Sequence, residues 1–198
     1  MKVETLFRLI VLVILGCAFL LSGLYRNKKS KEGESAAPQG DGMPSVLLQL
    51  LVGFALLAIF ILELFFPQLM GWSRMALPFW VRTLGVVLAL VCLIWIWWVF
   101  RALGDNISGK VPTGESQELI VSGPYRLVRH PLYAGALLGL FSFSLILENW
   151  LILVFTVLGV LAFRLLVIPE EEAQLLESFG EEYESYQART GALLPWIR

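Results

Sequence analysis

The chain has 198 residues, of which 58% are hydrophobic and 16% charged, with a mean hydropathy of +0.75 and a formal net charge of −1. Soluble domains carry about 25% charged residues, so this composition excludes a water-soluble globular protein, and its hydrophobicity excludes a disordered chain. The near-neutral net charge gives no support to a nucleic-acid-binding protein. The sequence therefore predicts an integral membrane protein.

Apolar runs long enough, or nearly long enough, to cross a membrane as helices occur five times. A helix needs about 20 apolar residues to span the hydrocarbon core, and none of the runs alternates as barrel strands do. The predicted spans are residues 6–25, 46–66, 80–100, 131–147 and 150–168. Only Glu148-Asn149 separates the last two, which predicts a tight antiparallel hairpin. The expected fold class is all-α: a bundle of five transmembrane helices followed by a C-terminal amphipathic cytoplasmic helix.

Basic residues are unevenly distributed between the predicted spans. The linker 26–45, the loop 101–130 and the tail after the fifth span carry most of them, whereas the opposite side has Lys2 and Arg74. The positive-inside rule places the N-terminus outside and the C-terminus in the cytoplasm, in a plasma or inner membrane if the source is prokaryotic. Because the first apolar run continues past Cys17, we expect a retained span rather than a cleaved signal peptide.

Several ionisable side chains lie inside the predicted spans, where each costs free energy unless it is paired or hydrated. Arg8 lies near the outer end of the first span, from which its guanidinium can reach the interface. Glu63 and Arg82 both lie near the outer face, and we expect a structural ion pair between them. Arg164 lies near the inner end of the fifth span, and it either extends to the surface or serves a site on the cytoplasmic face.

The segment 122–135, SGPYRLVRHPLYAG, contains the chain's single histidine. Pro131 suits the first position of a helix, which puts His130 at a helix N-terminus on the membrane surface. Free amide groups there favour an anionic ligand group, and Arg126, Arg129 and Tyr133 lie within about a turn of it. The alternative is that the arginines form only a basic interfacial flank that sets the topology.

Acidic residues are concentrated after the fifth span, between Glu170 and Glu184. Apolar positions in the same segment recur at helical spacing, which predicts an amphipathic helix with a break at Gly180. Most of these carboxylates suit a solvated face. Glu171 and Glu172 begin the predicted helix next to Arg164 and, through the hairpin, next to His130. Carboxylates placed there suit a cation, an amine or a pair of ribose hydroxyls.

Residues 103–195, nearly half the chain, resemble the isoprenylcysteine carboxyl methyltransferase superfamily, which includes phospholipid N-methyltransferases and small bacterial thiol or lipid methyltransferases. Each matching motif alone is weak, but their order around a helical hairpin is specific. The motifs are Leu103-Gly104-Asp105-Asn106, Gly123-Pro124-Tyr125, Arg129-His130-Pro131-x-Tyr133-x-Gly135, Glu171-Glu172-x-x-Leu175, Phe179-Gly180-Glu181-Glu182-Tyr183-x-x-Tyr186 and Leu194-Pro195.

The resemblance implies an S-adenosylmethionine-dependent methyltransferase acting on a lipophilic or small acceptor, a carboxylate, thiol or amine, at the cytoplasmic face. The implied cofactor-binding residues are Tyr125, Arg129, His130, Tyr133, Gly135, Glu171 and Glu172. Many relatives have an arginine where this chain has Val167, and we expect Arg164, one turn earlier, to replace it as the anchor for the acceptor. Arg164 and Arg129 are the predicted catalytic residues, with Arg129 or His130 holding the cofactor carboxylate.

The same resemblance divides the chain into two regions. Residues 1–101 are expected to form a three-helix transmembrane region, which would shape the lateral opening for the acceptor. Residues 102–198 are expected to form the methyltransferase core, made of the loop 102–130, the hairpin 131–168 and the tail 169–198.

Two other functions remain open on sequence grounds. NADPH-dependent sterol and steroid reductases share a similar arrangement of Arg-His-Pro, tyrosine and glycine, but this chain has Leu132 and Ala136 where they have Asn and an acidic residue. A non-catalytic membrane interaction protein would bind neither cofactor. Neither Cys17 nor Cys92 has the neighbours of a metal or redox site, so no metal is expected, and neither is a nucleic-acid partner.

Overall fold

The structure, a computed structural model, describes residues 3–31, 43–107 and 119–195, and in those ranges every regular element is a helix. The α-helices are α1 (Val3–Lys31), α2 (Met43–Phe65), α3 (Phe79–Ile107), α4 (Pro131–Ile146), α5 (Trp150–Ala162), α6 (Ile168–Phe179) and α7 (Glu181–Arg189). Two 3-10 turns, η1 (Gly71–Ser73) and η2 (Gly123–Arg126), and one π-helical turn, η3 (Phe163–Val167), complete the set. The all-α prediction is therefore confirmed for the described part of the chain.

A helix lies at each of the five predicted spans, and three helices are long and apolar enough to cross a membrane. These three are Val3–Tyr25, Phe79–Leu103 and Trp150–Phe179, while Val52–Phe65 and Pro131–Ile146 are shorter apolar helices. Their outward faces carry many exposed large hydrophobic side chains, as lipid-facing helices do. The chain is an integral membrane protein.

The segments between helices are shorter than the sequence predicted. The linker was expected over 26–45, but α1 continues to Lys31 and α2 begins at Met43, so only residues 32–42, which lie outside the described residues, separate the two helices. Similarly, α3 continues to Ile107, and Lys110 in the predicted loop lies outside the described residues. Lys and Arg, which have good helix propensity, extend α1 beyond its apolar run.

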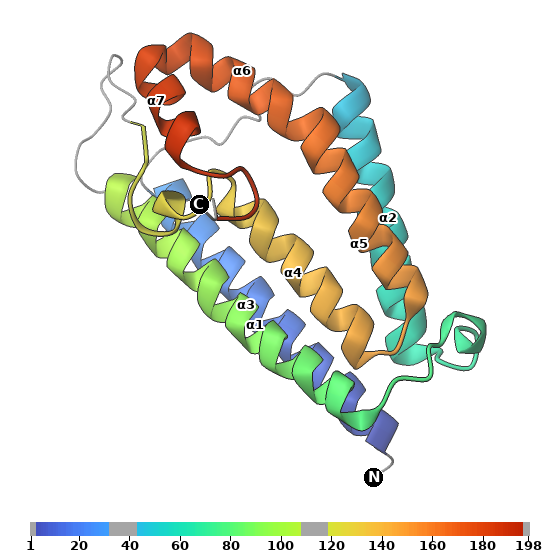
Figure 1. The fold of residues 1–198 in the computed structure, drawn as a ribbon. Helices are drawn as coiled ribbons and strands as arrows, with labels where there is room; N and C mark the ends of the chain where they lie inside the picture. The colour runs from blue at the N-terminus through green and yellow to red at the C-terminus, as the bar shows by residue number, and fades with distance from the viewer. Residues whose placement is uncertain (1–2, 32–42, 108–118, 196–198) are drawn as a thin grey trace.

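The helices form one bundle whose two ends differ in character (Figure 1). Helices α1, α3 and α4 lie side by side, α5 and α2 lie along the other side of α4, and α6 and α7 cover one end. That end, which includes the start of α4, is called the His130 end here. The opposite end holds the turn between α4 and α5 and is called the hairpin end.

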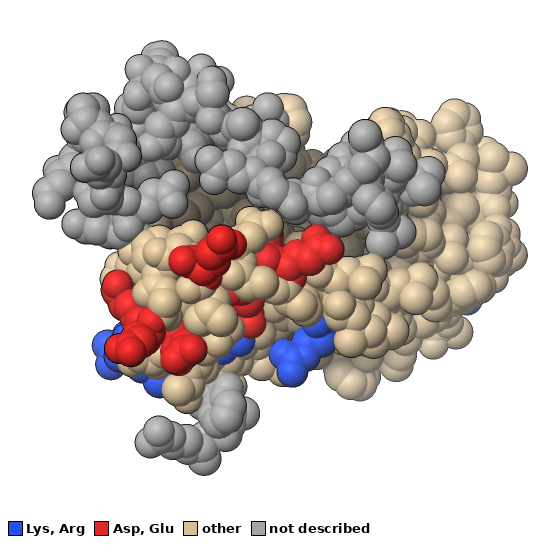
Figure 2. Space-filling view, turned by 90° about the horizontal axis from the view of Figure 1, so that it is seen from above, with Lys and Arg blue, Asp and Glu red and all other residues tan. Residues whose placement is uncertain are grey.

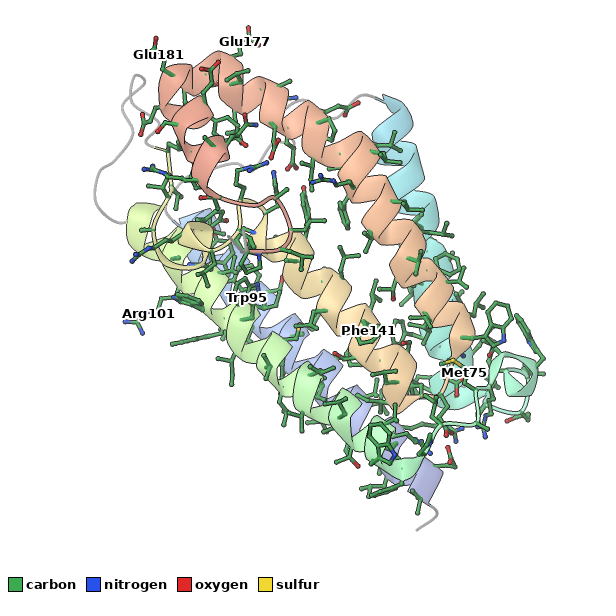
Figure 3. All side chains as sticks on the ribbon, in the orientation of Figure 1. Met75, Trp95, Arg101, Phe141, Glu177 and Glu181 are labelled. Carbon is green, nitrogen blue, oxygen red and sulfur yellow. The ribbon has the colours of Figure 1, made fainter. Side chains whose placement is uncertain are left out.

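Glycine allows α3 and α4 to pack closely. A Cβ atom on Gly135 would lie 2.7 Å from Ile96 Cδ1 and 2.9 Å from Trp95 Cδ1, and one on Gly85 would lie 3.0 Å from the Ser142 carbonyl oxygen. The approach at Gly135 is closer than Cβ atoms normally make, and the one at Gly85 is tight, so a methyl group at either position would force neighbouring atoms to shift. Trp95 Nε1 also donates a 2.8 Å hydrogen bond to the Pro131 carbonyl, which fixes α3 against the first turn of α4 (Figure 3).

The turn Glu148-Asn149 joins α4 and α5 and organises the hairpin end, as the predicted tight hairpin requires. Glu148 has a φ of 54°, in the left-handed region, and its carbonyl accepts a 2.6 Å hydrogen bond from the Met75 amide. Asn149 caps α5 by accepting hydrogen bonds from the amides of Leu151 and Ile152 at 2.9 and 3.2 Å. The turn is therefore held by the η1 loop as well as by its own helices.

The ion pairs at the hairpin end differ from the one that the sequence suggested. Arg82 pairs with Glu4 at 2.8 Å and with Glu148 at 3.3 Å, and Glu63 pairs with Arg8 at 3.8 Å. The predicted pair between Glu63 and Arg82 was wrong. The rotation of α1 directs Glu4 and Arg8 toward the other helices, and sequence position alone does not reveal that rotation.

Beyond α5 the helix continues through η3 into α6 without a break. Pro169 lies in the first turn of α6, where its missing amide and its ring would disturb an α-helical ladder. The five-residue π-helical turn directly before it widens the helix locally, which accommodates that disturbance. The break between α6 and α7 falls at Gly180, whose φ is 53°.

Candidate active site

The backbone at the start of α4 is held by the C-terminal segment. The amides of Arg129 and His130 donate to the carbonyls of Gly191 and Ala192 at 2.8 and 3.0 Å, next to a parallel bridge between Val128 and Gly191. These contacts join residues about 60 positions apart, so the residues after α7 fix where the α4 N-terminus points. The side chains of Arg129 and His130 are thereby directed toward α6.

Arg129 forms an ion pair with Glu172. Its Nε atom lies 2.8 Å from Glu172 Oε1, and the two side chains are only 11% and 16% exposed. Its Nη1 atom donates to the carbonyls of Gln187, at 3.2 Å, and Thr190. Its Nη2 atom forms no hydrogen bond with a described residue. One guanidinium thus joins three segments: helix α6, the end of α7 and the loop that precedes α4. It keeps one N–H group free to donate to a ligand.

His130 lies between the two glutamates of α6. Its Nδ1 atom is 3.2 Å from Glu171 Oε2 and its Nε2 atom is 3.2 Å from Glu172 Oε1. Burial lowers the pKa of His130, but the hydrogen bonds to Glu171 and Glu172 outweigh it, and the net pKa is raised above its usual value of 6.5. The geometry therefore favours the imidazolium, whose two N–H groups donate to the two carboxylates.

Tyr133 connects this pair of acids to the π-helical turn. Its hydroxyl donates to Glu171 Oε1. Its ring stacks on Phe163, with centroids 4.3 Å apart and planes 18° apart, and lies parallel to the His130 ring at 5.8 Å. The three rings form a column that runs from His130 to the start of η3. Rigid stacking of this kind fixes the Tyr133 hydroxyl relative to the carboxylates.

The two glutamates have different surroundings. Glu172 uses both oxygens within the protein, because Arg129 and His130 approach Oε1 and Gln187 Nε2 donates to Oε2 at 3.0 Å. Among the described residues, Glu171 forms hydrogen bonds and ion pairs with Tyr133 and His130 only, and its side chain is 35% exposed against 16% for Glu172. Glu172 is thus placed to position its neighbours, whereas Glu171 is accessible to a ligand.

The side chains of Arg129, His130, Tyr133, Glu171, Glu172 and Gln187 form one connected group, called the Arg129–Glu172 cluster. A buried hydroxyl beside this cluster has no hydrogen-bond partner among the described residues. Tyr183 is 1% exposed, and its hydroxyl makes no hydrogen bond with any described residue although Arg129 and Gln187 lie near it. Burial raises the pKa of Tyr183 to about 12, so the group remains a neutral donor. Orphaned buried polar groups are rare in proteins, and this one suits a ligand or water with polar atoms at the cluster.

The other predicted site residues lie around this cluster rather than in it. The Tyr125 carbonyl accepts a 2.6 Å hydrogen bond from the Tyr186 hydroxyl, and burial raises the pKa of the Tyr125 phenol. Gly135 faces α3, where close packing accounts for glycine. Arg164 lies in η3, is exposed, and forms no hydrogen bond or ion pair with a described residue. Val167, where the resemblance led us to expect an arginine in relatives, is buried.

Sequence reasoning did not assign roles to Gln187, Tyr183 and Phe163. Tyr183 belongs to the motif that carried the resemblance, so its helical register with Leu175 and Phe179 was the available signal. No sequence signal pointed to a role for Gln187 or Phe163, because a glutamine in a polar helix and a phenylalanine in an apolar helix are both common. Acidic side chains gather on the face of the molecule at this end (Figure 2). No three metal-ligating side chains are grouped in the described residues.

Comparison with known proteins supplies the family. A sequence model of the phospholipid methyltransferase family matches residues 80–182, which is more than half of the 198-residue chain. The chain belongs to the phospholipid methyltransferase family. The match extends from α3 through the hairpin into α7. It includes Arg129, His130, Tyr133, Glu171 and Glu172, whereas Tyr183 and Gln187 lie just beyond it. The resemblance stated from the sequence motifs is confirmed.

Individual known proteins are similar to parts of this chain. A probable protein-S-isoprenylcysteine O-methyltransferase from Oryza sativa subsp. japonica is 39% identical over 83 residues, 42% of this chain and 44% of that protein. The cobalt-zinc-cadmium resistance protein CzcN of Cupriavidus metallidurans is 38% identical over 114 residues, 57% of this chain and 46% of CzcN. A methanethiol S-methyltransferase from Pseudomonas deceptionensis is 35% identical over 74 residues, 37% of this chain and 27% of that enzyme. The chain spans less than half the length of these relatives.

Proposed function

We propose that this chain is an integral membrane methyltransferase that uses S-adenosylmethionine and methylates a lipophilic or small acceptor at the cytoplasmic face. The observation that carries the proposal is the cluster in which Arg129 and His130, at the start of α4, meet Glu171 and Glu172, at the start of α6. Family membership supports methyl transfer, and the relatives named methyltransferases modify a protein-linked isoprenylcysteine in one case and methanethiol in another.

Three features of the cluster fit S-adenosylmethionine, which supplies an electrophilic methyl group on a sulfonium. The exposed part of Glu171 can accept hydrogen bonds from ribose hydroxyls or from the amino group. The free Nη2 of Arg129 can bind the carboxylate. The buried Tyr183 hydroxyl lacks a partner that a bound molecule would provide. Glu172 keeps Arg129 and His130 in place for this task.

Arg164 is the residue that we propose for the acceptor. It lies in the π-helical turn, next in sequence to Phe163, whose ring stacks on Tyr133 of the cluster. Because π turns reorient side chains and often occur at functional sites, the turn offers a reason for Arg164 to be directed differently from a residue in a regular helix. An exposed guanidinium at the polar end of a span suits an acceptor with an anionic or polar group that enters sideways from the lipid phase.

The membrane arrangement in this proposal keeps five spans, with the N-terminus outside and the C-terminus in the cytoplasm. Residues 102–198 form the cofactor-binding core and residues 1–101 the region that shapes the acceptor opening. In support, the cluster, α6 and α7 all lie at the His130 end, which a water-soluble cofactor could reach from the cytoplasm (Figure 1). Positioning of donor and acceptor contributes up to roughly 7–11 kcal/mol to such displacements.

Calorimetry on the full chain in detergent tests this function. We expect the chain to bind S-adenosylmethionine and S-adenosylhomocysteine. The variant Glu171→Gln, which lacks one charged hydrogen-bond acceptor, should bind both compounds at least about tenfold more weakly. Glu177→Gln is the matched control, because Glu177 is exposed and points away from the bundle (Figure 3). Binding of NADPH instead, or binding of neither compound, would contradict the proposal and support a reductase or a non-catalytic protein.

A further inference from the structure

A cavity that does not include the Arg129–Glu172 cluster lies beside the last turn of α7. It has a volume of about 370 Å³ and is lined by Val121, Arg126, Tyr186, Arg189 and Thr190. None of these five residues is a carboxylate, and none belongs to the set assigned to the methyl donor or the acceptor. The volume lies at the lower end of the range for small-ligand sites and exceeds that of a single phosphate group.

The two arginines of this cavity lack acidic partners in the described part of the chain. Arg126 ends η2 and Arg189 ends α7, and both side chains are exposed. Arg189 forms no ion pair even though its own helix carries Glu181, Glu182 and Glu184. Two permanently charged arginines therefore line one hollow without an ion pair of their own among the described residues, which favours an anionic group there.

Neutral groups of the cavity add one further donor. The Thr190 hydroxyl makes no hydrogen bond with a described residue, although the residue is only 4% exposed. The Tyr186 hydroxyl is already engaged, since it donates to the Tyr125 carbonyl at 2.6 Å. The residues around the cavity thus offer two guanidinium groups and a hydroxyl that can donate, together with an aromatic residue.

We propose that this cavity binds the phosphate group of an anionic ligand. A phosphate has several acceptor oxygens and a net negative charge, which match two planar guanidinium forks and a hydroxyl better than a neutral or cationic group does. The cavity lies at the His130 end, the polar end of the bundle, where arginines attract anionic phospholipids. Either a lipid headgroup or a soluble phosphate has this chemistry.

The test measures binding directly on the full chain in a zwitterionic detergent. The probes are dioctanoyl phosphatidic acid, dioctanoyl phosphatidylcholine and inorganic phosphate, each followed by calorimetry. We expect phosphatidic acid or inorganic phosphate to bind, and phosphatidylcholine to bind more weakly. Tighter binding of phosphatidic acid than of inorganic phosphate indicates a lipid headgroup, whereas equal binding indicates a soluble phosphate.

Variants distinguish a built site from general charge attraction. Arg126→Gln and Arg189→Gln are each expected to weaken binding at least about fivefold, and Thr190→Val, which leaves the charge unchanged, about threefold. Arg74→Gln is the matched control, because Arg74 is an exposed arginine at the hairpin end. If the Gln variants are poorly folded, Arg189→Lys is used instead. It keeps the charge and shows whether the planar guanidinium is needed for binding.

Two results would overturn the proposal. One is the absence of binding by both anionic probes. The other is an equal loss in Arg74→Gln and in the cavity variants, which would indicate attraction by net charge alone. Neither result bears on methyl-donor binding, because the cavity residues and the donor residues do not overlap.

Discussion

Arg129 and Glu172, which are 43 residues apart in the sequence, meet with Arg129 Nε 2.8 Å from Glu172 Oε1. The pair joins the residue before His130 at the start of α4 to the N-terminal half of α6, and Gln187 of α7 donates to the second oxygen of the same carboxylate. Three segments therefore depend on one side chain that is 16% exposed. The position of the candidate methyl-donor site follows from this contact, since it holds α6 over the helix that carries His130 and Tyr133.

Replacement of Glu172 should affect stability and donor binding together. Glu172→Gln removes the charge that Arg129 and His130 share, and breaking a partly buried pair costs about 3 kcal/mol. We expect a lower Tm in detergent and at least about tenfold weaker binding of S-adenosylmethionine. Glu184→Gln, on the exposed face of α7, should change neither quantity. An unchanged Tm for Glu172→Gln would show that the pair does not hold α6.

The raised pKa of His130 predicts a specific pH dependence. The folded state binds the imidazolium proton more tightly than the unfolded state does, so the stabilisation is fully present below pH 6.5 and is lost as the pH rises through the raised folded pKa. The Tm difference between the wild type and His130→Gln should therefore be largest under acidic conditions and shrink above neutrality. A difference that grows with pH would contradict the assigned charge state.

Asn149 gives a prediction for the hairpin end. Its Nδ2 atom donates to Glu63 Oε2 and to Ser73 Oγ, both at 2.9 Å, and Glu63 is 1% exposed. Asn149→Ala removes the α5 cap and leaves the buried Glu63 carboxylate without one hydrogen-bond donor. We therefore expect the free energy of unfolding to fall by about 3 kcal/mol. Asn149→Asp should be worse, because it places a second charge beside Glu63. The affinity of the folded fraction for S-adenosylmethionine at 20 °C should be unchanged.

Two substitutions at Tyr133 separate the role of its hydroxyl from the role of its ring. Tyr133→Phe keeps the stacking on Phe163 and removes the hydrogen bond to Glu171, so donor affinity should fall about tenfold with little change in Tm. Tyr133→Leu removes the ring as well, and should lower the Tm in addition. Equal behaviour of the two variants would mean that the aromatic column has no structural role.

Gly135 should matter for packing. A Cβ atom there would lie 2.7 Å from Ile96 Cδ1, so Gly135→Ala should destabilise the α3–α4 contact by about 1–3 kcal/mol. Gly16→Ala is the control, because a Cβ on Gly16 meets nothing within 4 Å. Thermal unfolding in detergent measures both. Donor binding by the folded Gly135→Ala protein then tests the cofactor role that the family resemblance implied for this residue.

Several parts of the candidate site could be predicted from the sequence because they are local. Arg129, His130 and Tyr133 lie within one helical turn of Pro131, and Glu171 and Glu172 are adjacent, so spacing alone groups each set. The partners of each side chain could not be predicted. Glu63 was expected to meet Arg82, but the rotation of α1 gives Glu63 to Arg8 and Arg82 to Glu4.

The sequence by itself determined that the chain enters a membrane, that its elements are helices, and that Glu148-Asn149 turns the chain back, because hydropathy and residue spacing are properties of short segments. Only the tertiary structure decided that Glu172 is enclosed while Glu171 remains accessible, and that Arg126 and Arg189 line one cavity. These differences depend on how far each helix is rotated and how closely it approaches its neighbours. Close packing at positions such as Gly135 sets both, and it involves residues distant in the sequence.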